Sequence, residues 1–102
     1  MVRKITFKEA GRILAEEKNA VLLDVREEDE YITGHAIDAL LLPVDEITPQ
    51  RAAEALPDRD APILVYCRSG RRSRRAAKLL DGCGYTQLYN LGSLIGWPYG
   101  LE

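Results

Sequence analysis

The middle of this chain reads Tyr66-Cys67-Arg68-Ser69-Gly70-Arg71-Arg72-Ser73-Arg74-Arg75. An apolar run at residues 63–66 comes directly before the cysteine, and a helical pattern begins near Ser73. A thiol attacks as its thiolate, and a helix N-terminus with nearby cations lowers the pKa of a thiol. The same setting binds anions, because unpaired backbone N–H groups point toward the ligand. The stretch therefore predicts a nucleophilic thiolate that acts on something small and negatively charged.

Apolar runs alternate with helical patterns on both sides of this stretch. Runs typical of strands cover residues 3–6, 20–25, 39–42, 63–66 and 87–91. Helical patterns cover residues 7–17, 27–32, 48–56 and 73–82. Such alternation predicts an α/β fold with a central parallel sheet flanked by helices on both faces. Ligands of these folds bind beyond the carboxyl ends of the strands, and Cys67 lies at one of those ends.

The length and composition are those of an ordinary globular domain. The chain has 102 residues, of which 46% are hydrophobic and 29% are charged. We expect a single domain over residues 1–100, and we interpret residues 101–102 as a cloning scar. No apolar stretch is long enough to span a membrane and none forms a leader after Met1. We therefore expect a cytoplasmic protein, with a removed leader as the alternative.

Positive charge is concentrated around the cysteine. Six of the 14 lysine and arginine residues lie within residues 61–80, which contain no acid, although the net charge of the chain is −2. A compact cationic site on an acidic body favours a small anionic ligand over a polyanion. Nucleic-acid binders spread basic residues over a face and interleave aromatic residues, whereas Tyr66 is the only aromatic residue here. We expect neither a nucleic-acid partner nor a membrane partner.

The predicted site has Cys67 as its nucleophile. We expect substrate contacts from the six residues that follow it, Arg68, Ser69, Gly70, Arg71, Arg72 and Ser73. Gly70 would let the backbone curl so that successive N–H groups converge on one point. Ser73 is also interpreted as the N-cap of the following helix, and Arg74 and Arg75 as solvated surface charge. Because the segment after Cys67 is polar, we expect an exposed cysteine rather than a core one.

The remaining candidate residues receive structural interpretations. Cys83 shares an apolar helix face, so we interpret it as core packing, with a resolving thiol as the alternative. His35 is expected to make a structural hydrogen bond. Asp24 and Arg26 are expected to pair with neighbours and brace the loop rather than to act in catalysis. Two thiols and one histidine fall short of a closed zinc site, and nothing in the sequence indicates a metal or an organic cofactor.

Three motifs, taken together, resemble the single-domain rhodaneses, a family of sulfurtransferases, over nearly the whole chain. They are Leu22–Arg26 with Glu30-Tyr31 and Gly34-His35, then Val65–Ser73, then Gly84-Tyr85 with Asn90-Leu91-Gly92 and Trp97. The resemblance implies a rhodanese-like fold in which Cys67 accepts a sulfane sulfur as a persulfide. The donor would be thiosulfate or a similar small anion, and the acceptor a thiol or cyanide, or a partner protein.

The chain departs from the family pattern outside the cysteine loop. After Gly34-His35 the family usually continues with an isoleucine-proline-glycine-alanine turn, where this chain has Ala36-Ile37-Asp38-Ala39. The usual glycine pair before the final tryptophan is here Gly92-Ser93, and Pro98 leaves little room for a last helix. These departures affect local geometry and partner surfaces more than the chemistry.

Three other functions fit parts of the pattern. A persulfide carrier fed by a partner protein would use the same cysteine, and the sequence does not separate it from a thiosulfate enzyme. A cysteine phosphatase or arsenate reductase is less favoured, because phosphatase loops place an arginine six residues after the cysteine, where this chain has Ser73. A binding module without activity is disfavoured because the thiol and the cationic loop are both present.

Overall fold

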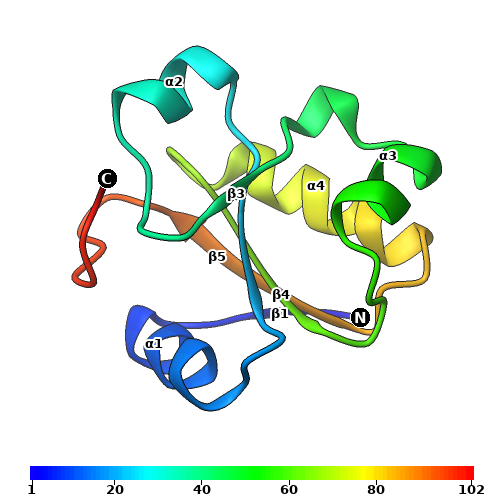
Figure 1. Ribbon diagram of the computed structural model, residues 1–102, viewed down its shortest axis with the longest axis horizontal. Helices are drawn as coiled ribbons and strands as arrows, with labels where there is room; N and C mark the ends of the chain where they lie inside the picture. The colour runs from blue at the N-terminus through cyan, green and yellow to red at the C-terminus, as the bar shows by residue number, and fades with distance from the viewer.

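The computed structural model describes residues 1–102 as a five-stranded sheet covered by helices (Figure 1). The strands are β1 (Val2–Lys4), β2 (Val21–Asp24), β3 (Leu40–Leu41), β4 (Pro62–Cys67) and β5 (Gln87–Ser93). The helices are α1 (Phe7–Glu16), α2 (Glu28–Thr33), α3 (Pro49–Ala55) and α4 (Arg71–Gly82), with a 3-10 turn η1 (Val44–Glu46). Every strand pairing is parallel, in the order β1-β5-β4-β2-β3. The predicted parallel α/β architecture is confirmed.

Helices lie on both faces of the sheet, with α1 on one side and α3 and α4 on the other (Figure 1). The central strand β4 is buried along its whole length, so each face of it meets a different core. Ile63, Val65 and Cys67 join the core under α3 and α4, and Leu64 and Tyr66 join the core under α1. This alternation follows from the two-residue period of a strand, and it directs the cysteine toward α4.

Two helices begin at the caps that the sequence indicates. The Thr6 hydroxyl accepts a hydrogen bond from the Glu9 backbone N–H at 3.1 Å, and the Glu9 carboxylate accepts one from the Thr6 N–H at 2.9 Å, which completes a capping box for α1. The Thr48 hydroxyl caps α3 by accepting a hydrogen bond from the Arg51 backbone N–H at 3.1 Å, with Pro49 in the first helical position. Thr6 and Thr48 thus set the residues at which α1 and α3 begin.

Helix α4 begins two residues earlier than predicted. Gly70 is its N-cap, with φ 97° and ψ −12°, a left-handed conformation that glycine adopts without a steric cost. Ser73 therefore lies one turn inside the helix, where it is fully buried. The interpretation of Ser73 as the N-cap is wrong, because the chain reverses at Gly70 and the helix follows at once.

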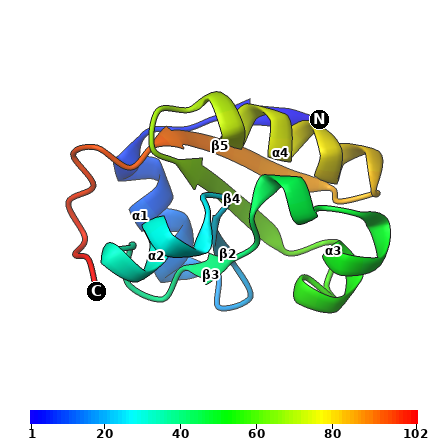
Figure 2. The same cartoon turned by 90° about the horizontal axis from the view of Figure 1, so that it is seen from above.

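The carboxyl ends of β4 and β5 meet α2 and the C-terminal segment at one end of the molecule (Figure 2). The C-terminal segment pairs there with the turn after α2. Leu101 forms an antiparallel bridge with Ala36, and His35 and Glu102 exchange two backbone hydrogen bonds of 3.0 and 2.8 Å. The segment after Pro98 thus contacts the turn at residues 36–39. Both segments were noted in the sequence as departures from the family pattern.

Candidate active site

The loop after β4 surrounds the sulfur atom of Cys67. The backbone N–H of Gly70 donates a hydrogen bond to Sγ of Cys67 at 2.9 Å. The backbone N–H groups of Ser69 and Ser73 and the Ser73 hydroxyl also stabilise the charge on the sulfur. Because Gly70 is left-handed and α4 begins at the next residue, backbone N–H groups of the loop point toward the sulfur. The arrangement has the geometry of an anion-binding nest built around a thiol.

This environment favours the thiolate form of Cys67. Burial raises the pKa of the Cys67 thiol, but hydrogen bonds from the Ser73 backbone, the Ser73 hydroxyl, Gly70 and Ser69 outweigh burial and leave the pKa below its ordinary value. The principal causes are thus hydrogen-bond donors at the start of α4 rather than the guanidinium charges. Hydrogen-bond donors that stabilise the thiolate make Cys67 a better candidate nucleophile than an ordinary cysteine.

Cys67 itself is buried, contrary to the expectation of an exposed cysteine. Its exposed fraction is 0%, and it belongs to the core under α3 and α4. The reason is that β4 continues through Cys67, so its side chain follows the strand alternation while only the next residues, Arg68 and Ser69, face solvent. The sulfur can therefore be approached only through the loop that encloses it.

Cys83 lies at the end of α4 and has no partner thiol, since both cysteines are free. Its side chain is partly buried and packs against the core that contains Cys67. The prediction of core packing for Cys83 is confirmed.

The five arginines of the loop and α4 divide into two groups. Arg72 forms a two-bond ion pair with Glu30 of α2, at 2.6 and 2.9 Å, and Arg75 pairs with Asp45 of η1 at 2.9 Å. The Arg72 hydrogen bonds lower the pKa of Glu30 to about 2, so this pair stays charged at any ordinary pH. The other three, Arg68, Arg71 and Arg74, form no ion pair.

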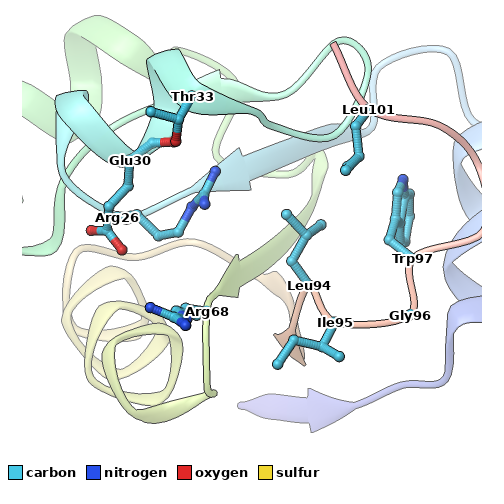
Figure 3. Close-up of a pocket in the computed structure, with 9 residues that line it drawn as sticks. All are labelled: Arg26, Glu30, Thr33, Arg68, Leu94, Ile95, Gly96, Trp97 and Leu101. Atoms are coloured by element: carbon cyan, nitrogen blue, oxygen red, sulfur yellow. The ribbon is translucent and has the colours of Figure 1, made fainter.

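Two cavities border the loop, one on each side. The first, of about 400 Å³, lies between the loop, α2 and the C-terminal segment, and Figure 3 shows the side chains that line it. The second, of about 370 Å³, lies between the loop, β1 and β5. Three cations, Lys4, Arg71 and Arg74, line the second cavity, which has no acidic residue. The two cavities differ in chemistry, because only the first has an extensive apolar wall.

Asp24 and Arg26 form a buried ion pair at the end of β2. The Asp24 carboxylate, which has no exposed surface, accepts hydrogen bonds from the Arg26 side chain and from the Tyr66 hydroxyl. Arg26 also donates to the Gly34 carbonyl at 2.7 Å, and the Tyr66 hydroxyl accepts from the Ala36 backbone N–H at 3.2 Å. The pair therefore braces the turn after α2 rather than the cysteine loop itself.

His35 makes the structural contacts that the sequence predicts. Its Nδ1 lies 2.8 Å from the Tyr31 carbonyl oxygen, and its ring stacks on the Tyr31 ring at 3.6 Å between centroids. Its Nε2 lies 3.3 Å from the Glu102 carboxylate. His35 thus ties α2 to the C-terminal segment.

The sequence did not reveal the residues of β5 that hold the loop. The Ser73 hydroxyl lies 2.8 Å from Oδ1 of Asn90 and 3.0 Å from the Gly70 carbonyl oxygen. Ser93 lies opposite Cys67 in the sheet, and its hydroxyl donates to the Arg68 carbonyl at 2.5 Å. The Asn90–Gly92 motif and the unusual Ser93 were visible in the sequence, but their contacts depend on the register between β4 and β5.

Replacing Ser73 with alanine is expected to raise the pKa of the Cys67 thiol. The hydroxyl is one of the groups that lower this pKa, while the Ser73 backbone N–H remains in the variant, so part of the lowering persists. The thiolate forms above the thiol pKa, so its ultraviolet absorbance should appear at higher pH in Ser73→Ala than in the wild type. Ser69→Ala is the control, because Ser69 acts through its backbone; an equal shift there would contradict the assignment.

Comparison with known protein families gives one consistent result. Residues 6–97 match the model of the rhodanese-like domain. A sulfurtransferase of Allochromatium vinosum is 38% identical over 98 residues, which cover 95% of this chain and 89% of the relative. The thiosulfate sulfurtransferase PspE of Escherichia coli strain K12 is 38% identical over 72 residues, covering 71% of this chain and 68% of PspE.

Solved structures agree with the sequence relatives. A rhodanese with anions from E. coli has a TM-score of 0.75 and 32% sequence identity, covering 81% of this chain and 96% of that chain. The Alr3790 protein from Anabaena sp. has a TM-score of 0.86 and 25% identity, covering 96% of this chain and 90% of that chain. In the structure of the present chain, no helix combines the length and the apolar character needed to cross a bilayer.

Proposed function

This chain belongs to the rhodanese-like family and is a sulfurtransferase, and we propose that the atom that carries the transferred sulfur is Sγ of Cys67. The observation that supports this assignment is the convergence of hydrogen-bond donors on that atom, including the Gly70 N–H at 2.9 Å. Cys83, the other thiol, packs at the far end of α4 and has no such donors. Cys67 is therefore the nucleophile that we assign.

In the first half of the proposed reaction, the Cys67 thiolate attacks the outer sulfur of thiosulfate or a similar anionic donor. A bond forms between the two sulfurs, the bond within thiosulfate breaks, and sulfite leaves with the electron pair. The terminal sulfur of the persulfide then lies at the centre of the loop, where the N–H groups and the N-terminus of α4 stabilise its negative charge.

The loop residues have different roles in this proposal. Ser69, Gly70 and Ser73 stabilise the sulfur through their hydrogen bonds. Arg68 and Arg71, which form no ion pair, offset the charge of the approaching donor. Arg72 is bound to Glu30, so its role is to hold α2 beside the loop rather than to meet the donor.

In the second half, a thiol or cyanide attacks the terminal sulfur and regenerates the Cys67 thiolate. Because the donor product leaves before the acceptor reacts, ping-pong kinetics are expected. A persulfide carrier that a partner protein loads would share this second half and differ only in its donor.

Thiosulfate is expected to add about 32 Da, the mass of one sulfur, to the wild-type chain, since the donor half-reaction ends in a stable persulfide. The measurement is the intact mass without reductant, followed by peptide mapping. The added mass should lie on the peptide that contains Cys67. Sulfur on Cys83 alone would overturn the assignment of the nucleophile. If thiosulfate adds no mass but a cysteine desulfurase does load the chain, the protein is a carrier that a partner protein feeds rather than a thiosulfate enzyme.

We also propose that the protein works in the cytoplasm. The mechanism needs Cys67 as a free thiolate, and both cysteines of the chain are free. Reducing compartments maintain free thiols, whereas oxidising compartments favour disulfides. Detection of the native protein in the cytoplasmic fraction of its source cells would test this proposal.

A further inference from the structure

The cavity between the loop, α2 and the C-terminal segment has two chemically different walls (Figure 3). One wall is apolar and comes from Leu94, Ile95, Trp97 and Leu101. The other wall is polar and comes from the end of β2, from α2 and from Arg68, the residue after the nucleophile. A ligand that fills this volume of about 400 Å³ must present both apolar and polar surface.

Within the polar wall, Arg68 is the one charge without an ionic partner. Arg26 is bound to Asp24, and the Glu30 carboxylate accepts two hydrogen bonds from Arg72 and one from the Glu27 backbone N–H. The guanidinium of Arg68 makes no hydrogen bond or ion pair, and the residue is exposed. The cavity is therefore electrostatically suited to one anionic group, placed close to the start of the loop.

The apolar wall lacks the cover that such side chains usually have. Ile95 is 74% exposed and Leu101 is 58% exposed, while Leu94 and Trp97 are half-buried. A ligand that covered these side chains would gain roughly 25 cal/mol for each Å² of apolar surface removed from water. Thiosulfate and cyanide have no carbon chain that could make this contact.

Hydrogen bonds to the backbone of Cys67 and Arg68 hold the apolar wall beside the nucleophile. The Leu94 N–H donates to the Cys67 carbonyl at 2.9 Å. The Ser93 hydroxyl donates to the Arg68 carbonyl and accepts from the Ile95 N–H at 3.1 Å. Leu101 is held by an antiparallel bridge to Ala36. Hydrogen bonds at Ser93 and Leu94 thus hold the apolar wall close to Cys67 and Arg68.

We propose that this cavity binds the sulfur acceptor, and that the acceptor is an organic thiol with an apolar carbon chain and an anionic group that pairs with Arg68. The inference rests on the proposed function, because it needs a persulfide on Cys67. The acceptor thiolate attacks the terminal sulfur of the persulfide, a sulfur–sulfur bond to the acceptor forms, and the bond to Sγ breaks. The electron pair returns to Sγ as thiolate, and the acceptor leaves as a persulfide, so the step needs no external oxidant or reductant.

The test uses the thiosulfate-loaded protein and three acceptors of defined structure. Mercaptohexanoate has both an apolar chain and a carboxylate, mercaptopropionate has only a short chain, and mercaptohexanol has no charge. The value of kcat/KM should be about tenfold higher for mercaptohexanoate than for either of the others, the range expected for a few methylenes or one ion pair. Equal values for the three thiols would overturn the cavity proposal.

Two variants connect this preference to the cavity. Ile95→Ser should reduce the ratio of kcat/KM for mercaptohexanoate to that for cyanide about tenfold, while Arg68→Gln should remove the preference for mercaptohexanoate over mercaptohexanol. Ile32→Ser is the matched control, since Ile32 is 71% exposed on α2 and does not line the cavity. An unchanged ratio in Ile95→Ser would contradict the proposal. If no persulfide forms with any donor, the proposed function fails, and this inference fails with it.

Discussion

Cys67→Ser is expected to leave no sulfur on the chain after thiosulfate treatment and to reduce turnover by at least about a thousandfold. A serine hydroxyl remains protonated at neutral pH and cannot carry a sulfane sulfur. The fold should persist, because the hydroxyl fits in the buried site and can accept the Gly70 N–H bond that Sγ accepts now. Intact mass and cyanide-dependent turnover, with circular dichroism for the fold, measure these outcomes.

Cys83→Ala is the matched control for the nucleophile. Cys83 is also a free thiol, but it packs against the core at the end of α4. Its replacement should leave sulfur loading intact and reduce the free energy of unfolding by about 1 kcal/mol, as expected for a small, partly buried side chain. Loading that persists in Cys67→Ser and is lost in Cys83→Ala would exchange the roles of the two cysteines.

The second large effect is expected from Asp24→Asn, through stability. The Asp24 carboxylate is fully buried and is the only ionic partner of Arg26, whose side chain is 9% exposed. Asparagine keeps the shape but removes the charge, so a buried guanidinium is left uncompensated. We expect the free energy of unfolding to fall by about 3–5 kcal/mol, a large part of the roughly 5–15 kcal/mol that stabilises a domain.

Urea unfolding of the wild type and of two variants tests this prediction. Asp45→Asn is the control, because the Asp45–Arg75 pair is largely exposed, with 71% and 62% of the side chains accessible. An exposed pair contributes about 0–1 kcal/mol, so this variant should unfold close to the wild type. Similar losses in both variants would show that burial of the Asp24–Arg26 pair has no special effect.

The sequence predicts the fold well, because the relevant signals are local. The apolar run before Cys67 is buried on both faces, as a central parallel strand must be, and the capping box at Thr6 lies where α1 begins. The start of α4 was misplaced because serine is a common N-cap, whereas here a left-handed glycine makes the reversal. A preference of serine for the N-cap position cannot show that the chain has already reversed three residues earlier, at Gly70.

The candidate site was only partly predictable for a different reason. The identity of Cys67 as a candidate nucleophile and the inward-pointing N–H groups follow from a short segment of sequence. The burial of Cys67 depends on strand alternation. Arg72 forms an ion pair, and Arg71 does not, because of where Glu30 lies in the fold. The cavity beside the loop joins Arg26, which follows β2, with residues of α2 and of the C-terminal segment. Contacts between distant segments leave no periodic pattern in the sequence.

The burial of Cys67 has a consequence for the lifetime of the enzyme. A thiolate with a lowered pKa is also the form that peroxide oxidises, first to a sulfenic acid and then irreversibly to sulfinic and sulfonic acids. Here the residue has no exposed surface, and the Gly70 N–H bonds directly to Sγ, so bulk water has little access to the sulfur. We therefore expect peroxide to react more slowly with Cys67 than with an exposed thiolate of the same pKa, and the partly buried Cys83 is the more accessible thiol.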